Sequence, residues 1–448
     1  IQPRFGFNYT FDTERPTQLR GGVGLFQGAA ASVWLANPYT NNGLTIAVFE
    51  DRTGTAAIFN PDPDNQPRPA SVPPAADVDI LDPDLEQPSV WKANLAFDHE
   101  LPFWGLVATA EFLYTKTEQG IYYEHLNLGA PTAFAPDGRE LYWNANGLDP
   151  ANWNQFGSNP FGSGVLNRAN RDGAYRDVVL ARPTNKGDAE SITFTLTKPM
   201  NAESNLFWQV GYSFNDATEV NPLTSSRAIS NWNGRAVFNP NEEVASRSNY
   251  AVRDRFTGAM SYRHFFFDGY KTEVSVFYEG RSGKPFSYTF DNDANGDGIF
   301  GNDLLYVPTG PGDVLFGTPE EEAAFFAYLA DNPELLAYRG RVAERNGQES
   351  PWVNTFDVRI SQELPGFMKE HRAEIWLDIL NIGNMINKDW GRIEEIGFPL
   401  NKGIVEYGGI DPTTGKYVYR FNTPDQTFFR DRTGESRWSL QVGFRYKF

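Results

Sequence analysis

The sequence predicts an all-β protein, a transmembrane antiparallel β-barrel of which about 11–12 strands lie in this chain. Three observations support this fold class. Eleven segments alternate apolar and polar residues, short and long connections alternate between them, and no run approaches the ~18 apolar residues that a membrane helix needs. The mean hydropathy of -0.48 is compatible with a membrane location, because lipid-facing and lumen-facing residues cancel in a barrel.

The last segment, 437–448, shows the alternation most clearly. Its apolar face consists of Trp438, Leu440, Val442, Phe444, Tyr446 and Phe448, and its polar face of Arg437, Ser439, Gln441, Gly443, Arg445 and Lys447. The other segments are 4–11, 17–27, 91–98, 105–117, 188–198, 205–215, 252–265, 270–282, 356–361 and 372–379. A period of two is typical of strands with one lipid-facing side and one wet side.

The connections between these segments alternate strictly in length. The short ones are 12–16, 100–104, 199–203, 266–269 and 364–369, and the long ones are 28–88, 117–187, 217–251, 283–352 and 383–435. All short turns therefore lie at one end of the strands, the periplasmic end in outer-membrane barrels, and all long loops lie at the extracellular end. Phe448 is expected beside the short turns. The alternative, a soluble β-sandwich, usually has connections of about 2–6 residues.

The strand count raises a question of completeness. Single-chain bacterial barrels have an even number of strands, whereas eleven segments are recognisable here. Residues 43–50 supply one more candidate strand, or a hairpin inside a loop. Because a free sheet edge in lipid is costly, we expect that strands preceding Ile1 are missing and that residues 1–448 are the C-terminal part of the barrel.

Composition excludes several function classes. There are 57 acidic residues against 39 lysines and arginines, a net charge of -18, so no basic face for nucleic acid is expected. Cysteine is absent, which excludes disulfides and thiolate chemistry. The four histidines are scattered and no nucleophile, phosphate-loop or zinc-protease motif is present, so no enzyme is predicted.

A series of short motifs carries a family resemblance. In order they are PRFGF (3–7), LRGGVGLF (19–26), VWKANLAFD (90–98), YTKTEQGIYYEHLNL (114–128), EGRSGKPFSYTF (279–290), NDLLYVP (302–308), NTFDVRISQELP (354–365), AEIWLDILNIGN (373–384) and FRYKF (444–448). This order resembles the barrel of Oar-like TonB-dependent outer-membrane receptors.

The resemblance implies a location in the outer membrane of a Gram-negative bacterium and a barrel of about twenty-two strands. It also implies an N-terminal plug and a contact with the TonB complex, both outside this sequence, and an extracellular cargo that is often peptide or protein. The alternate aromatics Phe444, Tyr446 and Phe448 resemble the signal that the barrel assembly machinery reads in a closing strand.

One loop is a candidate calcium site. Asp291, Asp293 and Asn295 place side-chain oxygens at positions 1, 3 and 5, and Gly296 stands at position 6, as in the loop of an EF-hand. Asp297 adds an oxygen at position 7. Position 12 is Asn302 where an EF-hand has Glu, and Asp303 is the candidate substitute. We expect a structural Ca²⁺ held by Asp291, Asp293, Asn295, Asp297 and Asp303; the alternative is a solvated polar turn.

Two other loop segments have distinct patterns. The proline-rich residues 60–88 favour extended backbone rather than strands. Residues 319–336 predict a short amphipathic helix, with Thr318 as N-cap, Glu321 as its capping-box partner, and Phe325, Leu329 and Leu336 on the apolar face.

These features favour a TonB-driven receptor that moves cargo through the outer membrane, inward or outward. A passive porin or an adhesion barrel is an alternative, and a secreted soluble β-rich binding protein is a third. Because the chain is acidic, its rim is expected to disfavour strongly anionic cargo unless bound Ca²⁺ offsets the charge.

Overall fold

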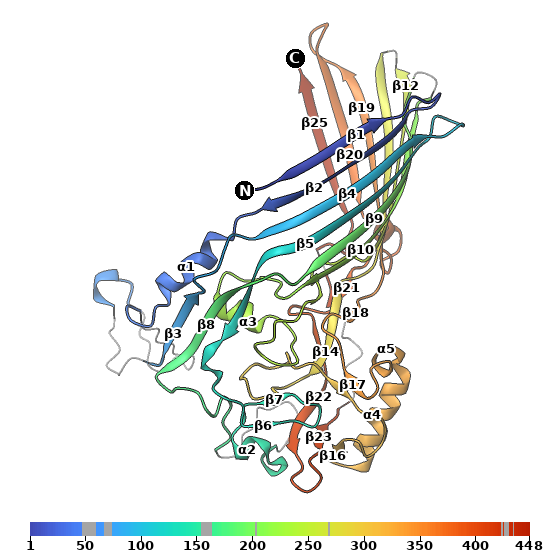
Figure 1. The fold of residues 1–448 in the computed structure, drawn as a ribbon. Coiled ribbons are helices and arrows are strands. Elements are labelled where there is room, and N and C mark those ends of the chain that lie inside the picture. The colour runs from blue at the N-terminus through green and yellow to red at the C-terminus, as the bar shows by residue number, and fades with distance from the viewer. Residues whose placement is uncertain are drawn as a thin grey trace.

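The computed structural model describes residues 1–46, 60–66, 74–153, 164–201, 204–267, 269–422, 424, 430–432 and 434–448. Its main element is an antiparallel sheet in which eleven strands follow one another in chain order (Figure 1). These strands are β1 (Arg4–Thr10), β2 (Thr17–Gln27), β4 (Ser89–Glu100), β5 (Val107–His125), β9 (Asp188–Lys198), β10 (Leu206–Glu219), β12 (Asp254–Phe267), β13 (Tyr270–Arg281), β19 (Val353–Pro365), β20 (Arg372–Leu380) and β25 (Ser439–Lys447).

The eleven strands coincide with the eleven segments predicted from the alternation, so that prediction is confirmed. The path begins at β1 and ends at β25, and among the described residues these two strands do not pair, so the barrel is not closed. The short connections gather at one end of the sheet and the long ones at the other (Figure 1). Lys447 pairs with Arg372 directly after a short turn, which places Phe448 at the short-turn end, as predicted.

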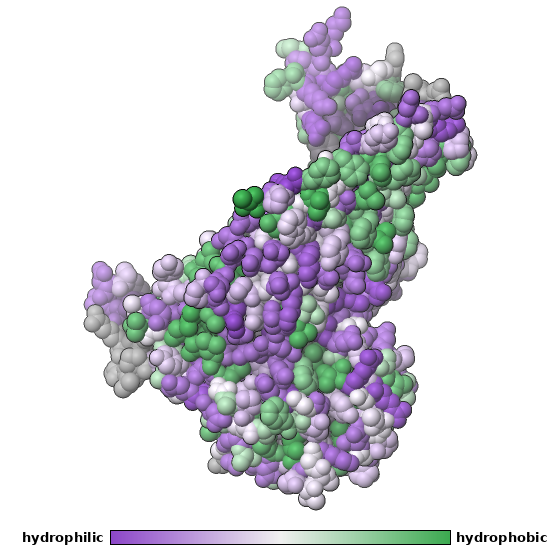
Figure 2. Space-filling model, in the orientation of Figure 1, coloured by the Kyte–Doolittle hydropathy of each residue, from purple (hydrophilic) through white to green (hydrophobic). Residues whose placement is uncertain are grey.

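The sheet has one apolar face that is open to its surroundings. Val210, Phe256, Val442 and Phe444 are each about half exposed or more, although they are large and apolar. Figure 2 shows hydrophobic residues gathered over the part of the sheet nearer the short turns. This is the surface that hydrocarbon would cover, and pairing along the strands satisfies the backbone groups there. No helix among the described residues is long and apolar enough to cross a membrane.

The long connections fold together into a compact body, here called the dome (Figure 1). Its central sheet has the order β16 (Leu315–Phe316), β23 (Tyr417–Arg420), β22 (Asn401–Ile410), β14 (Pro285–Phe290) and β18 (Gln348–Glu349). A second sheet segment pairs β3 (Ala76–Leu81) in parallel with β8 (Tyr175–Thr184), and β8 pairs with the far end of β5.

The remaining elements of the dome are short. The helices are α1 (Ser32–Thr40), α2 (Ala145–Leu148), α3 (Ala228–Asn233), α4 (Pro319–Asp331), α5 (Pro333–Leu336), α6 (Ile382–Ile386) and the 3₁₀ turns η1 (Pro63–Asn65), η2 (Leu126–Leu128) and η3 (Pro150–Asn152). The short strands are β6 (Ala133–Phe134), β7 (Glu140–Leu141), β11 (Ser246–Arg247), β15 (Tyr306–Val307), β17 (Arg341–Val342), β21 (Glu394–Glu395) and β24 (Arg430–Asp431).

The dome has its own aromatic core. Phe290, Tyr407, Tyr417 and Tyr419 are buried in it, and their ring pairs are either edge-to-face or tilted. The predicted helix over 319–336 is present as two helices, α4 and α5, with a break at Asn332. The predicted N-cap is confirmed, because the Thr318 hydroxyl accepts a hydrogen bond from the Glu321 N–H at 3.2 Å. The apolar face of α4 buries Phe325 and Leu329 as expected.

Beyond the turn that ends α4, it is Leu335 that is fully buried, whereas the predicted Leu336 is only partly buried. With this buried core, the dome is packed like a soluble domain, and the core fixes the positions of the loops around it.

The structure differs from the sequence prediction in the proline-rich connection. Residues 60–88 were expected to avoid strands, but Ala76–Leu81 forms β3. The prolines pause after Pro74, so the N–H groups that follow are free to pair with β8. In the candidate strand 43–50, residues 43–46 are not in a strand, and residues 47–50 lie outside the described part of the chain.

Candidate functional site

The polar face of the sheet carries paired charges of both signs. Arg359 on β19 donates to both oxygens of Asp378 on β20, at 2.5 and 2.7 Å. Near the first strands, Arg20 lies 3.1 Å from Asp98 and 3.3 Å from Glu111. Such half-exposed pairs add little stability, so their main consequence is a charged, wettable wall.

Where this wall meets the dome, the structure forms a cleft of ≈ 500 Å³, here called the rim cleft. The wall contributes Arg255, Glu279 and Arg281 from the ends of β12 and β13. The dome contributes Lys284, Glu395 and Arg432, together with apolar side chains. Charged groups from the wall and from two long loops therefore converge on one space.

The rim cleft contains more cations than carboxylates. Glu279 lies 3.2 Å from Arg255 and 3.4 Å from Arg281. Glu395, whose side chain is nearly buried, lies 3.3 Å from Lys284 and 3.1 Å from Arg432. Each carboxylate is thus shared by two cations, so the residues that line the cleft carry more positive than negative charge, on a chain of net charge -18. Outside this lining, Arg432 also lies 3.0 Å from Glu435. The acidic rim that composition suggested does not extend into this cleft.

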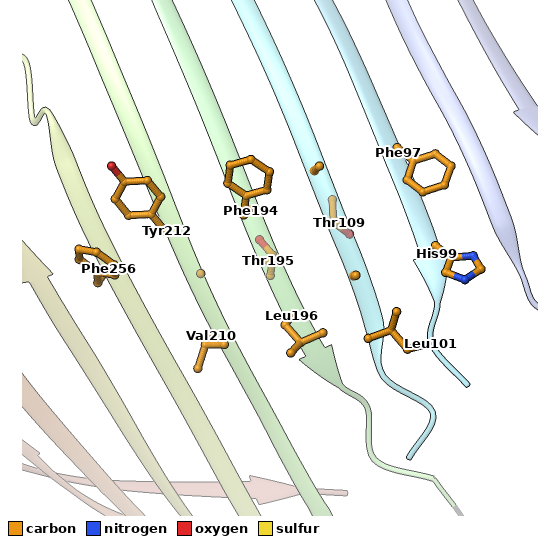
Figure 3. A pocket seen from close by; sticks show the side chains of 13 residues that line it. Phe97, His99, Leu101, Thr109, Phe194, Thr195, Leu196, Val210, Tyr212 and Phe256 are labelled. Carbon is orange, nitrogen blue, oxygen red and sulfur yellow. The ribbon is translucent and has the colours of Figure 1, made fainter. Parts of the chain in front are cut away.

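A second hollow, of ≈ 590 Å³, lies on the apolar face of the sheet (Figure 3). Phe97, Phe194 and Phe256 border it, and Ala108 and Ala110 leave the space between the larger side chains. Because this face is the lipid-facing one, we assign the hollow to contact with lipid chains and not to cargo.

The acidic loop predicted to bind calcium connects β14 to β15. Asp293, Asn295, Asp297 and Asp303 are brought together and buried, with exposures of 1% or less. Asp291 is exposed, so it does not belong to the buried group. Within the described residues, no three His, Cys, Asp or Glu side chains form a ready-made metal group. What converges is a mixture of carboxylates and amides.

Burial governs the protonation of this group. It raises the pKa of Asp293 well above its usual value, and the charges of Asp297 and Asp303 raise it further. Burial followed by the charge of Asp303 raises the pKa of Asp297 to about 7. Burial also raises the pKa of Asp303, but Arg139 opposes that shift. The loop therefore holds carboxylates whose charge is poorly compensated by the protein.

Sequence reasoning missed Arg139, the buried cation beside this loop. Its Nη1 donates to Asp303 at 3.1 Å and its Nη2 lies 3.4 Å from Asp137. Arg139 and Asp303 are 164 residues apart along the chain, so no local pattern connects them.

Of the three aromatics of the proposed assembly signal, Phe444 and Tyr446 lie on one face of β25, and Phe448 follows directly after the strand. Phe444 and Phe448 are exposed. The Tyr446 hydroxyl accepts a hydrogen bond from the Phe367 N–H at 3.0 Å and lies 2.7 Å from His371 Nδ1, so it ties the strand to the last short turn.

Residues 1–389 match the protein family described as an outer membrane beta barrel domain. No curated protein matches the sequence. Among solved structures, the outer membrane transporter YddB from Escherichia coli is similar, with a TM-score of 0.43 and 10% identity. That likeness covers 96% of this chain but only 38% of the transporter, and at this score it assigns no function.

Proposed function

Because this chain belongs to the outer membrane beta barrel domain family, we propose that it forms the wall and cargo-binding rim of a TonB-dependent outer-membrane receptor. The family places it in the outer membrane of a Gram-negative bacterium, with its apolar face against lipid. The observation that carries the proposal is the rim cleft, in which the charged wall and the dome meet around an excess of cations.

The rim cleft supplies recognition and no covalent chemistry. Glu279 orients Arg255 and Arg281, and this arrangement prepares the two guanidinium groups to bind a carboxylate of the cargo. On the opposite side, Lys284 and Arg432 are held by Glu395. The cargo class that fits is a peptide with a free C-terminal or acidic side-chain carboxylate. The polar wall below the cleft offers it a wet path.

A passive porin would have the same wall without a gate. The test must therefore measure peptide binding, and separately whether uptake depends on the inner-membrane potential. The full-length protein in detergent is incubated with a tryptic digest, and retained peptides are identified by mass spectrometry. One retained peptide is then labelled with a fluorophore and given to cells that produce the full-length protein. Uptake that stops when a protonophore collapses the inner-membrane potential supports TonB-driven transport. Uptake that continues unchanged and never saturates would establish a porin instead.

The rim cleft itself is tested by a matched pair on β12. Arg255→Gln is expected to weaken peptide retention roughly tenfold or more, since a hydrogen bond to a charged group is worth ~1.5–3 kcal/mol. Arg263→Gln removes the same charge from the same strand near the short turns, where Arg263 lies 3.6 Å from Glu273. It is expected to leave retention unchanged. Equal loss in both variants would contradict the assignment of the cleft.

A further inference from the structure

The loop between β14 and β15 wraps its backbone around side-chain oxygens at every second position. Asp293 accepts from the N–H of Gly296 at 2.6 Å and from the N–H of Gly298 at 2.8 Å. Asn295 Oδ1 accepts from the Asp297 N–H at 2.8 Å. The alternation therefore starts at Asp293, two residues later than the sequence suggested, and Gly298 takes the sixth position with a φ of +92°.

The charges of this loop do not balance. Asp303 is paired with Arg139, but Asp293 and Asp297 make no ion pair within the described part of the chain. Arg139 is already shared with Asp137. Two ionised carboxylates in a buried site cost several kcal/mol each unless a cation compensates them. The protein supplies the oxygens for such a cation without supplying the cation.

A separate observation points to a ligand at the same place. Asn302 is 3% exposed, and its Oδ1 atom is buried without a hydrogen-bond partner. Its Nδ2 lies 3.4 Å from Asp297 Oδ2, so the amide is directed at the carboxylate group. Exchange of the amide oxygen and nitrogen by rotation would turn this unpartnered oxygen toward the carboxylates, where its favourable partner is a cation or a carboxyl group that keeps its proton.

We propose that Asp293, Asn295, Asp297 and Asn302 bind one Ca²⁺ ion, with Asp303 held beside them by Arg139. Two carboxylates match the ion's charge, and the amides together with backbone carbonyls and water complete the six to eight oxygens that Ca²⁺ takes. Mg²⁺ is less suited, because it requires near-ideal octahedral geometry and gives up its water reluctantly. Asp291 of the original set lies outside the site.

The position of the loop shows what the ion does. Its carbonyls at Asn295 and Gly296 accept from the N–H groups of Tyr142 and Arg168, at 2.7 and 2.9 Å. Asn292 exchanges two hydrogen bonds with the backbone of Tyr407, and Asp303 bridges to Val237. Three long connections are thus fastened to this one loop, so Ca²⁺ would stabilise the whole dome. This inference does not depend on the proposed transport function.

The test uses full-length protein in detergent after removal of metals with a chelator. Titration with CaCl₂ in a calorimeter is expected to show one saturable site, and thermal unfolding of the dome is expected to shift upward with Ca²⁺ and much less with Mg²⁺. Tb³⁺ provides a local readout, because Trp143 packs against Gly296 and its Nε1 donates to the Ala294 carbonyl at 3.3 Å. Trp143→Phe should reduce sensitised Tb³⁺ emission while calorimetry still detects Ca²⁺.

Variants identify the site. Asp297→Asn and Asn302→Ala are each expected to weaken Ca²⁺ binding at least tenfold. Asp291→Asn, the matched change at the exposed neighbouring aspartate, is expected to bind like the parent protein. No saturable heat in the parent protein, or equal affinity in Asp297→Asn and Asp291→Asn, would overturn the proposal. If Asp297→Asn does not fold, the comparison rests on Asn302→Ala, which introduces no buried charge.

Discussion

The carboxylate of Asp177 lies 3.0 Å from Nε2 of His125, whose ring is fully buried. The other ring nitrogen, Nδ1, accepts from the Asn127 N–H at 3.1 Å, which assigns the hydrogen to Nε2 and makes Asp177 its acceptor. Arg168 donates to the same carboxylate at 2.9 Å. His125 ends β5 and Asp177 lies on β8, so this contact fastens the wall strand to the dome.

The contact predicts acid sensitivity of the dome. Burial by itself would raise the pKa of Asp177, but hydrogen bonds from His125 and Arg168 outweigh it and bring the pKa to about 2. The pKa of Asp177 is lower in the folded protein than in the unfolded chain. The ionised carboxylate therefore stabilises the dome fully above about pH 4, and this stabilisation is lost as the pH falls through 2. It amounts to roughly 2 kcal/mol at neutral pH.

Asp177→Asn should therefore lower dome stability at pH 7 by about that amount and flatten its pH dependence between 4 and 2. Thermal unfolding in detergent across this range measures both. Glu118→Gln, an exposed change on the same strand β5, should leave the profile unaltered. Identical pH profiles for Asp177→Asn and the parent protein would contradict the role assigned to Asp177.

The two faces of β10 predict opposite tolerance to charge. Val210 is 50% exposed on the apolar face. Val210→Arg should destabilise the folded protein in lipid vesicles by about 2–4 kcal/mol, the cost of arginine on a barrel's lipid face at the midplane. Gln209 lies on the polar face of the same strand, so Gln209→Arg should change the stability of the folded protein little. Equal costs would show that the faces are wrongly assigned.

The exposed aromatics of β25 predict an effect on assembly without an effect on stability. Phe448 is 97% exposed, so Phe448→Ala removes little packing. If the barrel assembly machinery reads this residue, the amount of folded protein in the outer membrane should fall several-fold, while the purified protein melts at the usual temperature. Lys447→Ala is the neighbouring control. Unchanged membrane levels would remove Phe448 from the assembly signal.

The cap of α4 predicts a local loss of stability. Thr318→Ala removes the hydroxyl that accepts from the Glu321 N–H, and this should cost the dome about 1 kcal/mol. Thr318→Ser retains the acceptor and should recover most of the loss. Chemical denaturation followed by tryptophan fluorescence distinguishes the two, and an equally destabilised serine variant would argue against capping.

Local pattern was sufficient to predict the wall. The alternation in 205–215 and 437–448 is a property of consecutive residues, and antiparallel neighbours joined by short turns pair in chain order. The same holds for α4, whose cap and apolar face lie within a few residues of each other. In these elements the partners that decide the structure are close in sequence.

The strand pairs of the dome could not be predicted from the sequence, because their members lie far apart along the chain. The parallel pairs β3 with β8 and β14 with β22 join segments about a hundred residues apart, and no local periodicity specifies such partners. The acidic loop 291–303 was identified from its composition, but the side-chain oxygens that converge in the structure begin at Asp293 and not at Asp291. Only the fold shows that Asp291 is exposed, that Asn302 is buried, and that Arg139 arrives from another connection.

The length of β5 has a mechanical consequence. Its first part pairs with β9 over 107–116, and the same unbroken strand then pairs with β8 over 120–125. A hinged lid needs a flexible joint, and along β5 the wall passes into the dome through continuous hydrogen-bonded strand. A force applied to the dome is therefore transmitted along β5 to the strands of the wall. Any movement of the dome relative to the wall at this joint must therefore break strand pairing along β5.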